Sequence, residues 1–277
     1  MASFRGKNLR SGDLAEQLGI LLLQNVALVS PVPRTEDVGI DVVATLIREF
    51  DGIKYIAEDS FFVQIKSISV TEITFKDEEV KWLAALQLPL FIASVDRKSS
   101  TVNLYSTHYL SDVLVTNPNR TEITLEFTEN LDFDCCDGSP TIKLPIGPPV
   151  ISWSLETFIT NENFLHEFYE LMKSHILITK KSIEIRRVGV AEIVSWETGK
   201  IPVVYGKKLK SLDTTEETEE ISAPYIHTFL NDLSLGKDIL VTRSIYRLLE
   251  KILEREQHFE IVDGVKKLIP YDASSKK

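Results

Sequence analysis

Two apolar segments separated by a turn signal constrain the fold of this chain more than any other feature. Residues 38–48 are rich in β-branched side chains, and residues 61–70 begin with two phenylalanines and continue as a mainly apolar run. Between them, Asp51 and Gly52 form a dipeptide that is typical of tight turns. The pattern predicts two strands that can pair as a hairpin.

Both predicted strands carry polar side chains inside their apolar runs. Asp41 lies in the first strand, and Gln64 and Lys66 lie in the second. Side chains alternate between the faces of a strand, so Gln64 and Lys66 point to the same side, and a hairpin allows Asp41 to reach that side too. A carboxylate, an amide oxygen and an ammonium group would then meet in a small volume.

These three groups suit metal-assisted chemistry on a phosphate. Mg²⁺ prefers oxygen ligands, usually one or two carboxylates together with waters and phosphate oxygens. A lysine beside the metal can orient or deprotonate a water molecule and offset charge on the phosphate. Each residue also has an ordinary explanation, because Asp41 could be a strand-end acid and Lys66 could face solvent. Burying a charged lysine in an apolar strand is costly, and this cost makes Lys66 informative.

A helix is predicted before the hairpin. Ser11 is a suitable N-cap, and residues 13–28 are apolar around most of the helix circumference, which predicts a buried helix. Glu16 shares a face with Ile20 and Leu23, an unusual place for an ionised carboxylate. The alternative is an ordinary first-turn acid that the helix dipole favours.

The order of the next predicted elements indicates the fold class. Residues 77–86 are predicted to be a helix, and residues 90–95 and 101–105 a pair of strands. Helix, strand, strand, helix, strand, strand is the order expected for an α/β sandwich with a central mixed sheet flanked by helices.

The signals weaken in the second half of the chain. They predict a strand at 121–127, a loop or boundary at 132–149, a helix at 161–174, a strand at 182–195 and an amphipathic helix at 240–258. We therefore expect a first domain at residues 1–150 and an α+β region at residues 151–277. The second region would recognise substrate, dimerise or bind a partner.

Composition limits the remaining functional classes. The chain has 277 residues and a net charge of −10, which argues against non-specific nucleic-acid binding. The five histidines are scattered, and no CxxC or glycine-rich phosphate loop is present, so a zinc site or a nucleotide-binding loop is not expected. Cys135 and Cys136 are adjacent and are expected to be reduced thiols.

Two further patterns concern location and charge. No signal peptide or membrane-length apolar run is visible, so a soluble, cytoplasmic protein with no membrane contact is expected. Basic residues cluster at two places, where solvated surface is favoured over phosphate contact. These clusters are Lys180, Lys181, Arg186 and Arg187, and Lys207, Lys208 and Lys210.

The motifs around the hairpin resemble those of the PD-(D/E)xK nuclease superfamily. The pattern Asp-x-Gly-Ile-Asp followed by Gln-Ile-Lys-Ser is similar to its Mrr-like restriction endonuclease branch, in which Gln often replaces the usual Glu. It is closer still to an uncharacterised bacterial family of that superfamily. The similarity covers roughly residues 10–110, with a spacing of 23 residues from Asp41 to Gln64. The motif segments are Ala15-Glu16, Gly39-Ile40-Asp41, Val63-Gln64-Ile65-Lys66-Ser67, Trp82 and Pro89-Leu90-Phe91.

The resemblance implies a role for each matching residue. Asp41 would be the principal metal ligand, and Gln64 the second, with the Ile65 carbonyl nearby. Lys66 would be the catalytic lysine, and Glu16 the helix carboxylate that completes the metal site. The cofactor would be Mg²⁺ or Mn²⁺.

The resemblance also implies an activity and a setting. The protein would be a Mg²⁺-dependent endonuclease with a restriction-endonuclease-like fold that hydrolyses phosphodiester bonds of nucleic acid, most readily DNA, in bacterial defence. A homodimer is expected, because cutting both strands of a duplex usually takes two active sites, and a partner protein from the same defence operon is a further possibility. The alternative is a non-catalytic module that keeps the nuclease fold and acts through protein partners. The net charge of −10 is consistent with this alternative.

Overall fold

The structure, a computed structural model, describes residues 7–33, 39–51, 54–128 and 138–209 and two short strands at 259–262 and 265–268. The chain divides into two compact units, Met1–Lys210 and Ser211–Lys277. In the second unit, the described strands β12 (Phe259–Val262) and β13 (Val265–Leu268) form an antiparallel pair. The predicted helix at 240–258 and the two cysteines lie outside the described residues.

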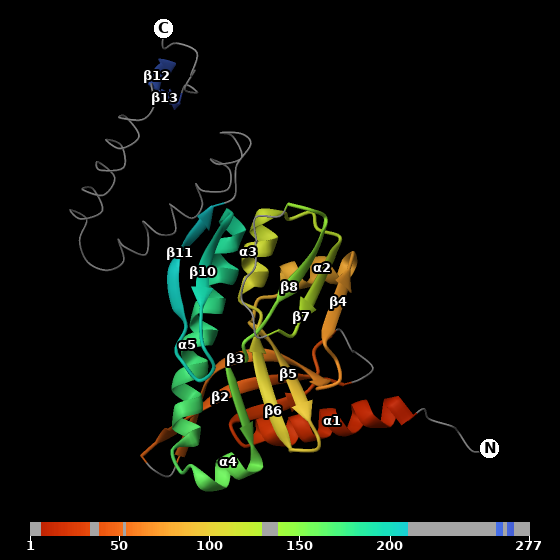
Figure 1. Cartoon of the computed structure of the whole chain (residues 1–277). Helices are drawn as coiled ribbons and strands as arrows, with labels where there is room; N and C mark the ends of the chain where they lie inside the picture. The colour runs from red at the N-terminus through yellow and green to blue at the C-terminus, as the bar shows by residue number, and fades with distance from the viewer. Residues whose placement is uncertain are drawn as a thin grey trace. The chain divides into compact units, whose positions relative to one another are not determined.

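A mixed six-stranded sheet forms the centre of the first unit, with the strand order β1-β2-β3-β5-β6-β9 (Figure 1). Strands β3 and β5 run parallel, and the other neighbours are antiparallel. Helix α2 (Glu78–Ala85) lies in the connection between the two parallel strands, as such a crossover requires. The strands are β1 (Ala27–Pro31), β2 (Val42–Phe50), β3 (Lys54–Ser67), β5 (Leu90–Asp96), β6 (Thr101–Ser106) and β9 (Ile151–Ser154).

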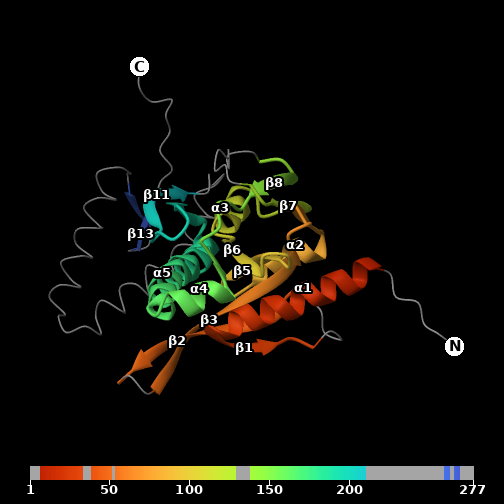
Figure 2. The ribbon, with the colours of Figure 1, turned by 60° about the horizontal axis from the view of Figure 1, so that its bottom comes forward.

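Both faces of this sheet are covered, which makes the fold α/β. On β3, Phe61, Val63 and Ile65 are buried in a core shared with α1 (Lys7–Gln24) and α5 (Phe164–Ile185). The opposite face packs against α2, α3 (Tyr109–Thr116) and a small sheet of three strands. Figure 2 shows α1 running along the central sheet. The small sheet consists of β4 (Glu72–Lys76), β7 (Glu122–Glu126) and β8 (Thr141–Pro145).

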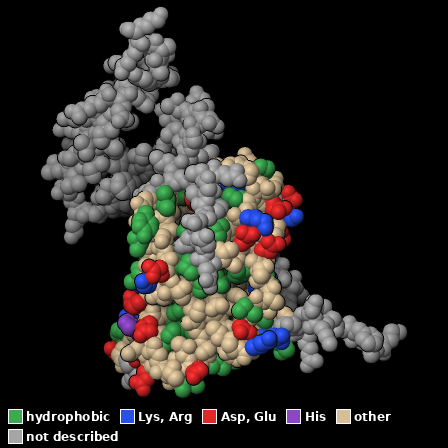
Figure 3. Space-filling view, in the orientation of Figure 1, with side chains coloured by type: hydrophobic (Ala, Val, Ile, Leu, Met, Phe, Trp, Pro, Cys, Tyr) green, Lys and Arg blue, Asp and Glu red, His purple; other side chains and the backbone are tan. Residues whose placement is uncertain are grey.

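The remaining elements follow β9 in sequence. A short helix α4 (Leu155–Thr160) precedes α5, and a 3-10 turn, η2 (Arg186–Val188), follows it. Strands β10 (Val190–Ser195) and β11 (Val203–Leu209) then form an antiparallel hairpin. On the surface shown in Figure 3, acidic and basic side chains gather over the small sheet, where Lys143 pairs with Glu72 and Glu126.

The predicted hairpin is present. Strands β2 and β3 pair antiparallel, with Val42 opposite Val63. Strand β2 begins at Val42, so Asp41 lies immediately before it instead of inside it. Helix α2 and strands β5, β6 and β7 also lie close to their predicted positions.

Several local predictions were wrong because tertiary contacts override the local pattern. Helix α1 ends at Gln24 instead of continuing to residue 28, because Ala27–Pro31 pairs with β2 as an edge strand. Helix α5 continues to Ile185, so residues 182–185 are helical instead of extended. The predicted loop at 132–149 contains β8, an edge strand where a terminal proline is tolerated.

The predicted domain boundary at residue 150 falls inside the first unit. Strand β9, at residues 151–154, pairs with β6 and extends the central sheet. Trp153 on this strand is 1% exposed, and its indole N–H donates to the Leu22 carbonyl of α1. The physical reason is that apolar side chains of β9 and α5 form part of the hydrophobic core on one face of the central sheet. Residues 151–209 therefore belong to the same unit as the hairpin.

Helix α1 packs tightly against the sheet at Gly19. A Cβ atom at this position would lie 2.8 Å from Ile65 Cγ2 and 3.1 Å from Val95 Cγ2. Gly19→Val should therefore lower the free energy of unfolding by roughly 1–3 kcal/mol or more, the usual cost of overpacking a core. Chemical denaturation measures this, with Gly12→Val as the control, because nothing lies within 4 Å of a Cβ at Gly12. Equal stability of the two variants would contradict the close packing.

Candidate functional site

Asp41 is fixed beside the segment that joins Gln64 to Lys66. One oxygen of its carboxylate, Oδ2, accepts a hydrogen bond from the Ile65 backbone N–H. The Asp41 N–H donates to the Val63 carbonyl at 3.0 Å, and the Asp41 carbonyl accepts from the Val32 N–H at 2.8 Å. The structure therefore brings the predicted acid to the predicted strand, with its backbone held from both sides.

Gln64 and Lys66 line the same pocket. They lie on the face of β3 opposite Ile65, whose side chain is buried against α1. Gln64 is 6% exposed, and its Oε1 atom is buried without a hydrogen-bond partner. Lys66 is half-buried, and in the part of the chain that the structure describes its Nζ atom makes no hydrogen bond or ion pair. Both groups are costly for the fold and available for a ligand.

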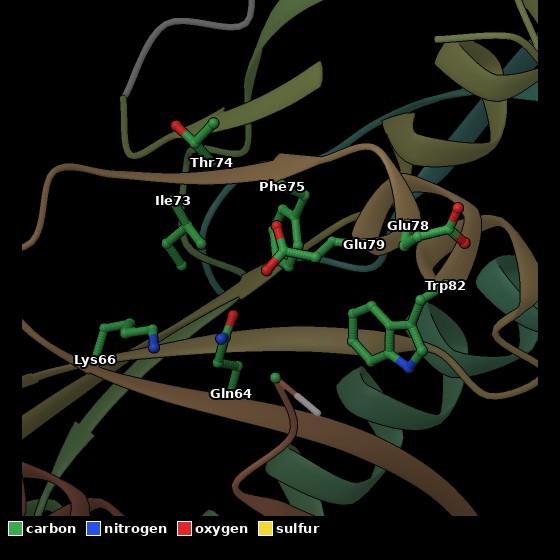
Figure 4. A pocket seen from close by; sticks show the side chains of 9 residues that line it. Gln64, Lys66, Ile73, Thr74, Phe75, Glu78, Glu79 and Trp82 are labelled. Carbon is green, nitrogen blue, oxygen red and sulfur yellow. The ribbon is translucent and has the colours of Figure 1, made fainter. Parts of the chain in front are cut away.

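The pocket has a volume of about 520 Å³, a size typical of small-molecule and cofactor sites. Figure 4 shows Lys66 and Gln64 side by side on β3, with β4 across from them and Trp82 of α2 towards one end. The Glu79 carboxylate points into the space between β4 and Gln64. Gly39, Gln64, Lys66, Ile73, Thr74, Phe75, Glu78, Glu79 and Trp82 line the pocket.

The described lining of the pocket carries little net charge. Among the described residues that line the pocket, Lys66 is the one basic residue, whereas Glu78 and Glu79 are both acidic. Two nearby lysines are neutralised by ion pairs, Lys76 with Glu122 at 3.0 Å and Lys81 with Glu78 at 2.6 Å. Because Glu78 is paired with Lys81, Lys66 and Glu79 leave the described lining close to neutral, and a metal ion would supply the further positive charge that favours a phosphate here.

The oxygen groups fit a hard divalent cation. Gln64 offers a buried oxygen with no partner, and the Asp41 carboxylate is tied to the adjacent Ile65. Among the described residues, no group of three or more His, Cys, Asp or Glu side chains is arranged to hold a metal. A metal here would therefore have fewer than three such side chains as ligands among the described residues and would need neutral oxygens such as that of Gln64.

Glu16 comes from the other side of the sheet. It lies on α1, next to the buried Ala15 and one turn before Gly19, where the helix packs on Ile65. Its side chain is half-buried, and it is not one of the residues that line the pocket. The structure thus places Gln64 and Lys66 in the pocket and holds Asp41 beside them through the Ile65 N–H, whereas neither Asp41 nor Glu16 is among the residues that line it.

The pocket wall formed by α2 was missed from the sequence. Glu79 and Trp82 lie three residues apart on this helix, so they share a face, while Val80 and Leu83 are buried on another. The three-residue spacing indicates that Glu79 and Trp82 share one face of the helix, but it does not predict which strands that face will contact.

Arg186 holds the end of α2 in place. Its Nη2 atom donates to the carbonyls of Ala84 at 2.6 Å and Leu86 at 3.1 Å, groups that a helix end leaves without partners. Burial lowers the pKa of the guanidinium to about 10, so it remains charged at neutral pH. A residue 100 positions later in the chain therefore fixes the helix that carries Glu79 and Trp82.

The first predicted basic cluster is already engaged within the chain, as expected for structural surface. Lys180 pairs with Asp59 at 2.5 Å and Lys181 with Glu192 at 2.6 Å. Arg187 donates to the Gln87 side chain. These cations are not poised to bind phosphate. The side chains of the second cluster lie outside the described residues.

A buried histidine pair lies apart from the pocket lining. His108 Nε2 is 3.0 Å from His175 Nδ1, and the Thr179 hydroxyl is 2.7 Å from His108 Nδ1. The rings stack, with centroids 5.3 Å apart, and Trp196 packs edge-on against both. Burial lowers the pKa of His175 to about 4 and holds that of His108 well below its usual value.

No family model, curated protein or solved structure matches the chain. The resemblance to PD-(D/E)xK nucleases therefore stands on the motif residues themselves. None of the described helices is both long and apolar enough to cross a membrane.

Proposed function

We propose that this protein is a metal-dependent nuclease that hydrolyses phosphodiester bonds, most readily those of DNA. The observation that carries the proposal is the link from the Asp41 carboxylate to the Ile65 N–H, between Gln64 and Lys66. Structural roles alone rarely place an acid, a buried amide oxygen without a partner, and a lysine with no partner among the described residues, around three consecutive residues of a buried strand. A mixed sheet with helices on both faces agrees with the restriction-endonuclease-like sandwich that we propose as the fold.

Each residue would have a distinct task. Bound Mg²⁺ or Mn²⁺ would neutralise phosphate charge and make water a better nucleophile. Asp41 and Gln64 would hold the cation with a carboxylate and an amide oxygen, and the Ile65 carbonyl would lie beside them. Lys66 would orient the attacking water, or take its proton, and offset the charge that develops on the phosphate.

The test is cleavage by the purified protein. Incubated with plasmid and with single-stranded DNA in Mg²⁺ or Mn²⁺, the wild type should cut, and EDTA should stop it. Asp41→Asn keeps the shape and the hydrogen-bond acceptor but removes the charge, so cleavage should fall by at least about 100-fold, the size typical of losing one preorganised electrostatic group.

The control is Asp96→Asn. Asp96 also accepts from a backbone N–H at a strand end, that of Lys98 at 2.9 Å, but its partners Lys98 and Ser99 lie in the turn after β5 and not between Gln64 and Lys66. Its variant should cut like the wild type. Equal cleavage by wild type and Asp41→Asn, or metal-independent cleavage, would overturn the proposal. A stable protein that cuts nothing would favour the alternative, a nuclease fold that acts through protein contacts.

A further inference from the structure

The far wall of the pocket is aromatic, although the near wall is polar. The Trp82 indole stacks on Phe75, with ring centroids 6.2 Å apart and planes at 24°. Phe75 is 5% exposed and supports the indole, whereas Trp82 is only half-buried and lines the pocket. A half-exposed tryptophan backed by a buried ring is a rigid flat platform, which is the kind of surface on which nucleobases stack.

The pocket is shaped to leave this platform open. Gly39 has φ +82°, and a Cβ there would lie 3.5 Å from Trp82 Cη2 and 3.8 Å from Gln64 Nε2. A larger side chain at Gly39 would thus extend into the space between the indole and the Gln64 amide. Glycine at this position keeps the aromatic platform and the polar groups of β3 in one continuous cavity.

The two walls together match one nucleotide. Lys66 and Trp82 lie towards opposite ends of the pocket, with Gln64 between them (Figure 4). A phosphate beside Lys66 and Gln64 therefore leaves room for its base to reach Trp82 within about 520 Å³. The Gln64 amide supplies hydrogen-bonding groups in the middle of that space.

We infer that the pocket takes an unpaired nucleotide, with its base against Trp82 and its phosphate towards Lys66. This inference rests on the proposed nuclease function and specifies its substrate. A base inside a duplex is stacked and paired, so it reaches such a pocket only after it leaves the helix. The preferred substrate is therefore a single strand or an unpaired end rather than an intact duplex.

Binding can be measured without cleavage. With EDTA present, so that no metal-dependent cleavage occurs, a single-stranded oligonucleotide should quench the tryptophan fluorescence of the wild type, and the quench should be lost in the Trp82→Phe form. Trp153 and Trp196 remain in that form but are only 1% and 3% exposed, so they report little. DNA and RNA strands of the same sequence show which sugar the pocket accepts. A hairpin duplex of that sequence should bind at least about ten-fold more weakly.

The contribution of base stacking to the affinity is measured by removing either the indole from the protein or the base from the oligonucleotide. Trp82→Leu should weaken single-strand binding roughly 10- to 100-fold, as expected for one base–aromatic stack. An oligonucleotide with an abasic site at the bound position should bind the wild type more weakly than the intact strand by a similar factor. Trp82→Leu should bind the abasic and the intact strand with almost equal affinity. Tyr55→Leu removes an exposed aromatic ring on the same strand β3 outside the pocket, and it should bind normally.

The outcomes separate this inference from the proposed function. Metal-dependent cleavage with equal use of duplex and single strand, or with no effect of Trp82→Leu, overturns the inference and leaves the nuclease proposal standing. Quenching and an abasic-site effect without any cleavage support the nucleotide pocket and reject the nuclease. Thermal unfolding of Trp82→Phe and Trp82→Leu identifies misfolding. If Trp82→Leu is misfolded, the loss of quenching in Trp82→Phe and the affinity of the wild type for abasic strands test the inference instead.

Discussion

Lys66→Met should lower the rate of DNA cleavage by about 100- to 1,000-fold, the loss usual when one group that stabilises transition-state charge is removed. Methionine keeps the apolar stem of the side chain and removes only the ammonium group. Lys66 Nζ has no ion pair or hydrogen bond in the described part of the chain, so the fold loses no contact. The thermal midpoint should therefore stay the same or rise, because a half-buried, unpartnered charge is no longer carried.

Single-turnover cleavage and thermal unfolding of the same preparation check both parts of this prediction. Lys143→Met is the matched control, since Lys143 is an exposed lysine on β8 with two ion pairs and does not line the pocket. It should leave cleavage unchanged. Loss of both activity and stability in Lys66→Met would mean that Lys66 is structural, which would contradict its proposed role.

Acidification from pH 8 to pH 5 should lower the free energy of unfolding by about 2 kcal/mol through His175 alone. In the folded protein, burial lowers the pKa of this ring from 6.5 to about 4, so it stays neutral over most of that range. The unfolded chain binds the proton near pH 6.5. The contribution of His175 to stability is therefore fully present above pH 6.5 and is lost as the pH falls from there towards 4.

His108 should add to this loss in the same direction, because burial and the neighbouring His175 both lower its pKa. Carboxylates act in a lower window. The pKa of Glu58, for example, is lowered to about 2 by hydrogen bonds from Lys173, Tyr169 and Arg48, so its contribution disappears below its ordinary value of 4.5. Between pH 8 and pH 5 the histidine pair should dominate.

Urea denaturation at pH 8, 6.5 and 5 measures this pH dependence. The His175 Nε2 atom lies 3.4 Å from the Lys200 carbonyl, to which a glutamine side chain can also donate, but glutamine does not titrate. The stability of the His175→Gln protein should therefore fall less between pH 8 and pH 5. His166→Gln is the control, because His166 is an exposed histidine on the same helix α5. An identical pH dependence in the wild type and His175→Gln would show that the buried pair does not govern acid sensitivity.

The hairpin could be predicted from the sequence because its signals are local. Alternation fixes which side chains share a face of a strand, and this was enough to place Gln64 and Lys66 together. The exact register, with Val42 opposite Val63, was not predictable, since it depends on the loop and on the packing of β1 and α1. Asp41 therefore reaches Ile65 from just outside the strand instead of from within it.

The other walls of the site depend on distant parts of the chain. Trp82 was noticed as a motif residue, but its stacking on Phe75 arises only because β4 pairs with β7, about 50 residues later. The β4 segment is short and polar on one side, so periodicity did not reveal it. For Glu16, the helical position was predicted correctly. Its separation from the pocket was not predictable, because it depends on which face of the sheet α1 covers.

The hydrogen bonds from Arg186 to the end of α2 have a consequence for the order of synthesis. Residues 41–82 leave the ribosome well before Arg186, so the strand that carries Gln64 and Lys66 emerges while α2 still lacks this support. Domains fold as units once their sequence has emerged. The pocket can therefore be completed only late in translation, and a nascent chain that stops before residue 186 carries the proposed catalytic residues without the finished wall that faces them.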